Sequence, residues 1–218
     1  MRVTHLGHAC LLVESAGRRV LVDPGTLSPA FDDVTDLDAV LVTHVHRDHL
    51  DVDRVPALLA ANPRAVLHAD PASTEALRRT GLSAASPLEP GGELAIGDLR
   101  VRVVGELHAH AFDSVERVPN AGLVMSADGE PTLFHPGDAL DAEPGAVDVL
   151  AHPLSAPWAA SRDGVEFVGR IRPRAVVPIH DALLSDAGRG LYGAHVRQLT
   201  DLPDLEYVDL GPGESSEL

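Results

Sequence analysis

The feature that most constrains this chain is a cluster of metal-ligand side chains directly after a buried strand. Residues 38–42 (Asp-Ala-Val-Leu-Val) form a short apolar run that is typical of such a strand. Three histidines and one aspartate follow within six positions: His44, His46, Asp48 and His49. Imidazole nitrogen and carboxylate oxygen suit zinc or another borderline divalent ion, whereas a polar surface turn needs no imidazole. The spacing therefore predicts a metal site on a loop at the carboxyl end of a strand.

The charge balance and residue usage exclude several kinds of chemistry. The 218 residues carry 17 basic and 33 acidic side chains, which gives a formal net charge of −16. Because binding to a phosphate backbone depends on cationic side chains, we expect no nucleic-acid partner. All 17 cations are arginine, so catalysis by a lysine base or Schiff base and a nucleotide-binding loop ending in Gly-Lys are excluded.

The sequence shows no sign of export or of a membrane span. No apolar run approaches the ~20 residues needed to cross a bilayer. Residues 1–6 read as a strand instead of a charged-then-apolar signal, and the single Cys10 cannot form an internal disulfide. We therefore expect a cytoplasmic protein without membrane insertion. The sequence does not indicate an oligomeric state.

The order of the predicted elements limits the fold class. Apolar runs predict strands at residues 3–6, 9–14, 18–22, 38–42, 65–68, 94–96, 99–104, 121–126, 131–135, 147–151, 175–179 and 205–208. Helices are predicted at residues 52–61, 73–80, 163–171 and 192–199. A loose tail is predicted from residue 211 onward. The even scatter of apolar runs predicts one domain over residues 1–218. Pattern and composition alone indicate α+β or α/β.

The motif His44-x-His46-x-Asp48-His49 after a hydrophobic strand resembles the signature of the metallo-β-lactamase superfamily of metal-dependent hydrolases. Two further segments, residues 7–10 (Gly-His-Ala-Cys) and 23–25 (Asp-Pro-Gly), resemble the opening of one branch of it. That branch contains ascorbate-6-phosphate lactonase and the N-acylphosphatidylethanolamine phospholipase D-like hydrolases. The resemblance covers nearly the whole chain. It implies a four-layer αββα sandwich, in which two mixed β-sheets pack face to face with helices outside.

The resemblance also implies the ligands of two metal ions. One ion would be held by His44, His46 and His108, the other by Asp48, His49 and His180, and Asp138 would bridge them. Strand periodicity leaves His110 open as an alternative to His108, because positions two apart project to the same side of a strand. The resemblance favours His108, since related hydrolases place this ligand directly after a strand and a short glycine-containing step.

Six further side chains are expected close to these ligands. Asp23 is expected to support the metal loop, although turn chemistry explains an Asp-Pro-Gly sequence about equally well. His8 and His135 match positions in the related hydrolases, with ordinary buried histidines as the equal alternative. Specificity residues usually come from loops after strand ends, where His110, His152 and Trp158 are predicted to lie.

A metal-dependent hydrolase is the function that these expectations favour. Two divalent ions, with Zn²⁺ first and Fe or Mn as alternatives, would bridge a hydroxide that attacks a bond of a small-molecule substrate. The bond would be of the ester, lactone, thioester or phosphodiester type. Asp48 would act catalytically by orienting the hydroxide and accepting its proton. The alternatives are an iron-dependent oxygenase or redox member of the same fold and a metal-stabilised binding module without turnover.

Overall fold

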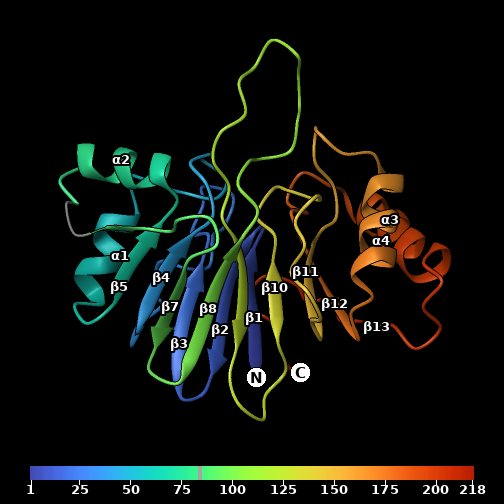
Figure 1. Cartoon of the computed structure of the whole chain (residues 1–218), viewed down its shortest axis with the longest axis horizontal. Coiled ribbons are helices and arrows are strands. Elements are labelled where there is room, and N and C mark those ends of the chain that lie inside the picture. The colour runs from blue at the N-terminus through green and yellow to red at the C-terminus, as the bar shows by residue number, and fades with distance from the viewer. Residues whose placement is uncertain (83–84) are drawn as a thin grey trace.

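Two β-sheets packed face to face form the centre of the computed structural model, which describes residues 1–82 and 85–218 (Figure 1). The first sheet has the strand order β14-β1-β2-β3-β4-β5-β6, and the second has the order β13-β12-β11-β10-β9-β8-β7. The strands of the first sheet are β1 (Arg2–Gly7), β2 (Cys10–Ser15), β3 (Arg18–Val22), β4 (Ala39–Val42), β5 (Val66–Ala69), β6 (Ser86–Pro87) and β14 (Ser215–Glu217). Those of the second are β7 (Glu93–Ile96), β8 (Leu99–Val104), β9 (Gly122–Ser126), β10 (Leu133–His135), β11 (Val149–Pro153), β12 (Ala175–Ile179) and β13 (Glu206–Tyr207).

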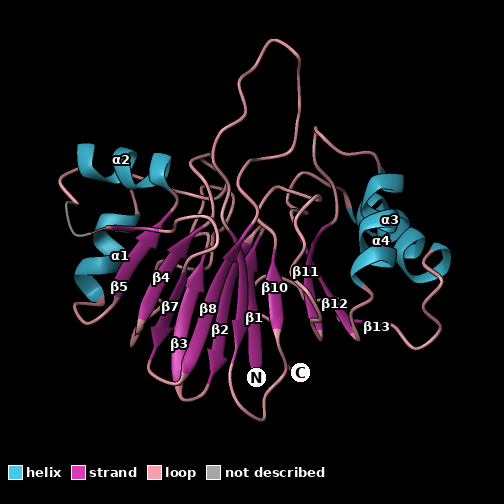
Figure 2. Ribbon diagram, in the orientation of Figure 1, coloured by secondary structure: helices cyan, strands magenta, loops and turns pink. Residues whose placement is uncertain are grey.

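Helices cover the outer faces of both sheets (Figure 2). Helices α1 (Val55–Ala61) and α2 (Pro71–Arg79) lie beside the first sheet, and α3 (Ser161–Ile171) and α4 (Asp186–Leu199) lie beside the second. This arrangement confirms the predicted sandwich of two mixed sheets with helices outside. Among the described residues, no helix combines the length and the apolar character that crossing a bilayer requires.

The pleat of the strands divides the apolar side chains between three cores. In β2, Leu11 and Val13 point into the core between the two sheets, whereas Cys10 and Leu12 point to the opposite face. Because successive side chains of a strand alternate, one strand supplies both layers. The core behind the second sheet contains Phe167 of α3 and Val196 of α4, together with outward-facing strand residues. Strands buried on both faces explain the nearly continuous apolar runs in the sequence.

Two predictions for the carboxyl-terminal part of the chain are wrong. The predicted loose tail contains β14, which pairs antiparallel with β1 through Arg2 and Glu217. Helix α4 begins at Asp186 and not at residue 192, and the Ser185 side chain caps it by accepting a hydrogen bond from the Gly188 N–H. Both termini of the chain therefore belong to the structured body, and β14 extends the first sheet by one strand. One domain over residues 1–218 remains a prediction, which this pairing supports.

The topology brings several strand ends to one edge of the sandwich. Strands β3, β4 and β5 run parallel to one another, as do β10, β11 and β12. The loops that follow β4, β8, β10 and β12 meet at the upper edge in Figure 1, where residues 105–121 form a long projecting loop. This edge collects the polar residues that the sequence places after those strands.

Candidate metal centre

Two groups of ligand-type side chains lie at this edge. In the first group, the ligand atoms of His44, His46, His108 and Asp138 all lie within 4.8 Å of one another. In the second group, those of His8, Asp48, His49 and His180 do the same. The structure thus brings together all seven predicted ligands and adds His8, which sequence reasoning left as a neighbouring residue. Each group offers enough nitrogen and oxygen atoms for one divalent ion.

The carboxylate of Asp138 connects the two groups. Its Oδ2 lies 3.3 Å from Nε2 of His108 and 3.9 Å from Nε2 of His44, both in the first group. The same oxygen lies 3.2 Å from Nε2 of His180, and Oδ1 lies 3.1 Å from Nε2 of His49, both in the second group. A single buried carboxylate therefore faces the ring nitrogens of both groups.

Several buried polar atoms at the centre lack a hydrogen-bond partner within the part of the chain that the structure describes. They are Nε2 of His44, His49 and His180 and Oδ1 of Asp138. The close approach of His49 to Asp138 is not aligned as a hydrogen bond. Leaving such a buried atom unpaired costs about 1–3 kcal/mol, and four of them converge here. A divalent ion in each group would satisfy them, so these residues fit metal ions.

The hydrogen bonds around the rings leave the Nε2 lone pairs directed at the centre. Nδ1 of His108 donates to the Ala109 carbonyl at 2.7 Å, and Nδ1 of His180 donates to the Ser155 carbonyl at 2.7 Å. Both partners can only accept, so each Nδ1 carries the proton. The same tautomer follows for His49, whose Nδ1 donates to a carboxylate oxygen of Asp23 at 2.7 Å. Such outer partners fix the ring orientation of metal-ligating histidines.

Asp23 has the supporting position expected of it. It is fully buried, and its Oδ2 accepts hydrogen bonds from the Thr43 hydroxyl and from His49 at 2.7 Å each. Its Oδ1 accepts from the Thr43 N–H at 2.7 Å. Since the Thr43 hydroxyl donates to Asp23, it accepts from Nδ1 of His44 at 3.0 Å. Asp23 thus orients two rings, one from each group.

Gly25 allows the motif loop to approach the turn after β3. A Cβ atom on Gly25 would lie 1.8 Å from the Asp48 carbonyl oxygen and 2.6 Å from the His49 nitrogen. Both neighbours are backbone atoms of the motif, which cannot move aside alone. The glycine of the Asp-Pro-Gly sequence is therefore required by close packing against the motif.

Gly25→Ala is expected to weaken metal binding and to lower the free energy of unfolding by about 1–3 kcal/mol, the usual cost of overpacking. Gly169→Ala is the matched control, because a Cβ atom there would meet nothing within 4 Å. Equilibrium metal titration and urea denaturation of both variants measure the effect. Equal metal affinity in the two variants would mean that the motif loop tolerates displacement.

His8 holds Asp48 from the turn between β1 and β2. The Ala182 N–H approaches Nδ1 of His8 at 3.4 Å, so that nitrogen accepts and Nε2 carries the proton. Nε2 lies 3.2 Å from Oδ2 of Asp48, to which it donates. The His8 carbonyl accepts from the His180 N–H at 2.9 Å, which ties the turn to the end of β12. His8 is fully buried, and its φ of 53° lies in the left-handed region.

The other expected neighbours separate into those at the centre and those outside it. Trp158 lies at the centre, where its indole N–H donates to Oδ2 of Asp138 at 3.0 Å. His135 lies behind it as a scaffold residue: Nε2 donates to the Ala9 carbonyl at 3.0 Å, and Nδ1 accepts from the Gly137 N–H at 3.2 Å. His110 lies on the projecting loop with 54% of its side chain exposed, 3.8 Å from Asp113. The structure therefore leaves His110 outside both groups.

The expectation that His152 lies on a loop near the site is wrong. His152 belongs to β11 and is buried on the face that packs against α3. Its ring centroid lies 6.4 Å from that of Phe167, and a Cβ atom on Gly164 would lie 2.9 Å from the ring. The strand continues two residues beyond its predicted end and turns this side chain away from the ligand loops. Burial lowers the pKa of His152 to about 4.

Acid is expected to destabilise the folded chain through His152. The unfolded chain binds a proton here below its ordinary pKa of 6.5, whereas the folded chain resists it down to about 4. The stabilisation is therefore complete above pH 6.5 and lost as the pH falls toward 4. Relative to His152→Leu, the wild type should lose roughly 2 kcal/mol of unfolding free energy between about pH 7.5 and pH 5. Urea denaturation with chelator present tests this, and parallel pH curves would contradict it.

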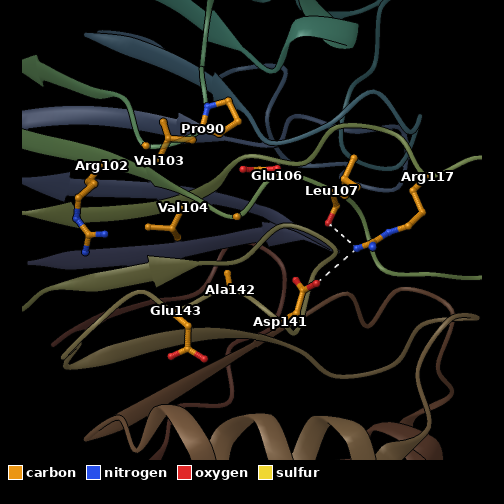
Figure 3. Close-up of a pocket in the computed structure, with 12 residues that line it drawn as sticks. Pro90, Arg102, Val103, Val104, Glu106, Leu107, Arg117, Asp141, Ala142 and Glu143 are labelled. Atoms are coloured by element: carbon orange, nitrogen blue, oxygen red, sulfur yellow. Dashed lines mark hydrogen bonds and ion pairs between the residues drawn. The ribbon is translucent and has the colours of Figure 1, made fainter.

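Two residues that position the ligand loops were not predicted from the sequence. Asn120 accepts from the Asp138 N–H at 3.0 Å and donates to the Pro136 carbonyl at 2.9 Å, which fixes the loop after β10. Arg117 donates to the carbonyls of His108 and Leu107 at 2.5 and 3.3 Å and lies 3.5 Å from Asp141 (Figure 3). Neither residue follows a strand directly, so the pattern used to find the ligands does not mark them.

A cavity of about 630 Å³ lies beside this arginine (Figure 3). Its lining includes residues 102–107 at the end of β8 and residues 141–143 after the Asp138 loop. None of the seven predicted ligands lines it, so the cavity lies next to the metal centre and does not contain it. Arg117 forms part of the wall between them.

The carboxylates control the protonation of the rings around them. Burial lowers the pKa of His180, but the nearby carboxylates of Asp138 and Asp48 outweigh it and raise the pKa to about 9. The same balance of burial against Asp138 and Asp23 raises the pKa of His49. For Asp48, the nearby rings of His180 and His8 outweigh burial and lower the pKa. A metal ion must displace protons from such rings, so proton release accompanies metal binding.

Solved structures with the same fold include metal enzymes of more than one kind. A novel metallo hydrolase, Igni18 from Ignicoccus hospitalis, has a TM-score of 0.74 at 19% identity, over 100% of this chain and 98% of its own. CmlA, a diiron β-hydroxylase from Streptomyces venezuelae, has a TM-score of 0.74 at 17% identity, over 100% of this chain and 54% of its own. At these identities the likeness shows the fold alone.

Sequence comparison identifies the family. Residues 2–180 match the model described as a beta-lactamase superfamily domain. Protein Rv0786c of Mycobacterium tuberculosis is 40% identical over 201 residues, 92% of this chain and 93% of that protein. A UPF0173 metal-dependent hydrolase of Carboxydothermus hydrogenoformans is 30% identical over 199 residues, 83% of this chain and 84% of that protein. The chain therefore belongs to the beta-lactamase superfamily and, within it, to the UPF0173 family.

Proposed function

We propose that this chain is a hydrolase that holds two divalent metal ions. His44, His46 and His108 would hold one ion, Asp48, His49 and His180 the other, and Asp138 would be shared. The observation that carries the proposal is the position of Asp138, whose two oxygens face ring nitrogens of both groups at 3.1–3.9 Å. The UPF0173 metal-dependent hydrolase of Carboxydothermus hydrogenoformans supports the reaction class.

The ions would supply hydroxide at neutral pH, because two bound divalent ions lower the pKa of water toward ~7. Asp48 would orient the water and accept its proton as hydroxide forms, since it is the carboxylate of the centre that remains partly exposed, at 30%. His8 and His180 hold Asp48 in place from two sides, at 3.2 and 3.5 Å from its Oδ2. His46 is also exposed, so a substrate could reach the centre at Asp48 and His46.

The proposal extends to the identity of the metal, the class of substrate and the cellular location. We propose Zn²⁺, which suits a set of histidine and aspartate ligands, with Fe or Mn as alternatives. The substrate would be a small molecule with an ester, lactone, thioester or phosphodiester-type bond, and the protein would be cytoplasmic. This set of bonds comes from the different hydrolases of the superfamily that share the motif His44-x-His46-x-Asp48-His49. Within the superfamily, we propose a relation to the branch with ascorbate-6-phosphate lactonase and the phospholipase D-like hydrolases.

Elemental analysis and a substrate screen test the proposed function. Protein reconstituted with Zn²⁺ should contain two ions per chain and should hydrolyse at least one of the four bond types. Chelator should abolish this hydrolysis, and added metal should restore it. A maximum of one ion would contradict the shared role of Asp138. Iron in protein from unsupplemented medium together with oxygen uptake would favour an oxygenase.

A further inference from the structure

Trp158 is the only tryptophan of the chain, and it lies at the point where the two ligand groups meet. It belongs to the loop between β11 and α3, and its side chain is partly buried. Its ring centroid lies 5.7 Å from that of His108 and 6.3 Å from that of His180, in edge-on arrangements. One indole thus packs against a ring from each group.

The indole N–H makes a directed contact with Asp138. It donates to Oδ2 at 3.0 Å, the oxygen that also faces Nε2 of His108 and of His180 at 3.3 and 3.2 Å. Asn120 fixes the backbone of Asp138 by accepting its N–H, and the rotation of the carboxylate depends on the contacts of its two oxygens. Oδ2 lies 3.3 Å from Nε2 of His108, but the indole N–H is the contact whose donor does not depend on a histidine tautomer. By holding Oδ2, the indole keeps Oδ1 directed at His49.

We propose that Trp158 is a positioning residue that sets the rotation of the Asp138 carboxylate, so that Oδ2 faces His108 and His180 while Oδ1 faces His49. The inference rests on the proposed function, since it assigns to Trp158 the orientation of the shared ligand. It requires the N–H group as well as the ring, because packing against His108 and His180 alone would not choose a carboxylate rotation. A phenylalanine at this position keeps an aromatic ring and removes the donor.

The single tryptophan makes the inference measurable without any substrate. On titration of the metal-free protein with Zn²⁺, the emission of Trp158 should change and saturate at the same metal equivalents as uptake measured with a competing chromophoric chelator. Trp158→Phe should bind at least one ion ~10–100-fold more weakly, the usual effect of removing a partner of a metal ligand. Phe112→Ala is the matched control, because this aromatic is 60% exposed on the projecting loop, and it should bind as the wild type does.

Asp138→Asn separates this inference from the proposed function. If Asp138→Asn loses an ion while Trp158→Phe keeps wild-type affinity for both, the shared ligand stands and the positioning role of Trp158 is wrong. If wild-type emission does not respond to metal, the indole is not coupled to the carboxylate and the inference is also wrong. If Asp138→Asn keeps both ions at full affinity, the proposed centre itself fails and the role of Trp158 fails with it.

Discussion

Asp48→Ala is expected to abolish turnover while the chain stays folded. Asp48 lies on the motif loop and keeps 30% of its side chain exposed, so it contributes little to any apolar core. Its carboxylate has two proposed tasks, to bind the second ion and to orient and deprotonate water. Losing the acid–base task alone typically costs ~10²–10⁴-fold in rate, and losing the ion removes the remaining activity. The measurements are kcat on a confirmed substrate, metal content and the urea midpoint of unfolding.

Asp53→Ala is the matched control for this variant. Asp53 follows in the same loop region, but its side chain is 77% exposed and lies 3.5 Å from Arg47 at the surface. An exposed ion pair of this kind contributes about 0–1 kcal/mol, so activity and stability should stay close to wild type. Asp48→Asn adds a second test, because it keeps the shape and removes the charge. Retention of most activity by Asp48→Ala would remove this residue from the mechanism.

The four proposed ligands of the motif could be predicted from the sequence alone, whereas the choice of His108, Asp138 and His180 also needed the family resemblance. His44 follows the apolar run of β4, and His180 follows that of β12, so the strand pattern marks both positions. Strands β4 and β12 belong to different sheets, and the packing of the two sheets brings their carboxyl ends to the same edge of the sandwich (Figure 1), which explains why residues far apart in the sequence meet. Asp138 follows the shorter β10 and a turn at Gly137, and there the family resemblance was needed.

The missed elements are those whose sequence carries no apolar periodicity. Strand β14 has the sequence Ser-Ser-Glu, and its pairing with β1 joins residues at opposite ends of the chain. The first half of α4 contains Gly188 and Gly190, which have low intrinsic helix propensity, so packing and the Ser185 cap decide its start. Pairing between distant residues therefore determined β14, whereas packing and a local cap determined the start of α4.

The roles of His8 and His152 could not be separated from the sequence for a related reason. Both are buried histidines near strand ends, but they differ in the direction of the ring. His8 lies in a turn whose left-handed backbone directs the ring at Asp48, whereas His152 lies within a strand and faces α3. A shift of one residue in a strand moves a side chain to the opposite face, and strand ends are the least predictable part of an element.

His108 and His110 also differ in the direction of the ring, and this difference decides which of them can be a ligand. The Leu107–Pro119 bridge and the Arg117 contacts hold the chain at His108, whose ring is buried against Asp138. Two residues later the chain has entered the projecting loop, and the His110 ring is more than half exposed. A strand that continued through both positions would have placed both rings on one side. The end of the strand is what separates them.

His108→Ala is accordingly expected to reduce the metal content of the reconstituted protein from two ions to one, whereas His110→Ala should keep both. His108 offers its Nε2 within the first group, and alanine leaves His44 and His46 with only the shared carboxylate as a further ligand. Removing His110 takes away an exposed ring with one distant carboxylate neighbour, so neither metal affinity nor the free energy of unfolding should change measurably. Elemental analysis of the two variants side by side, after identical reconstitution, makes the comparison. Loss of metal from His110→Ala together with two ions in His108→Ala would reverse the assignment and place the projecting loop over the centre.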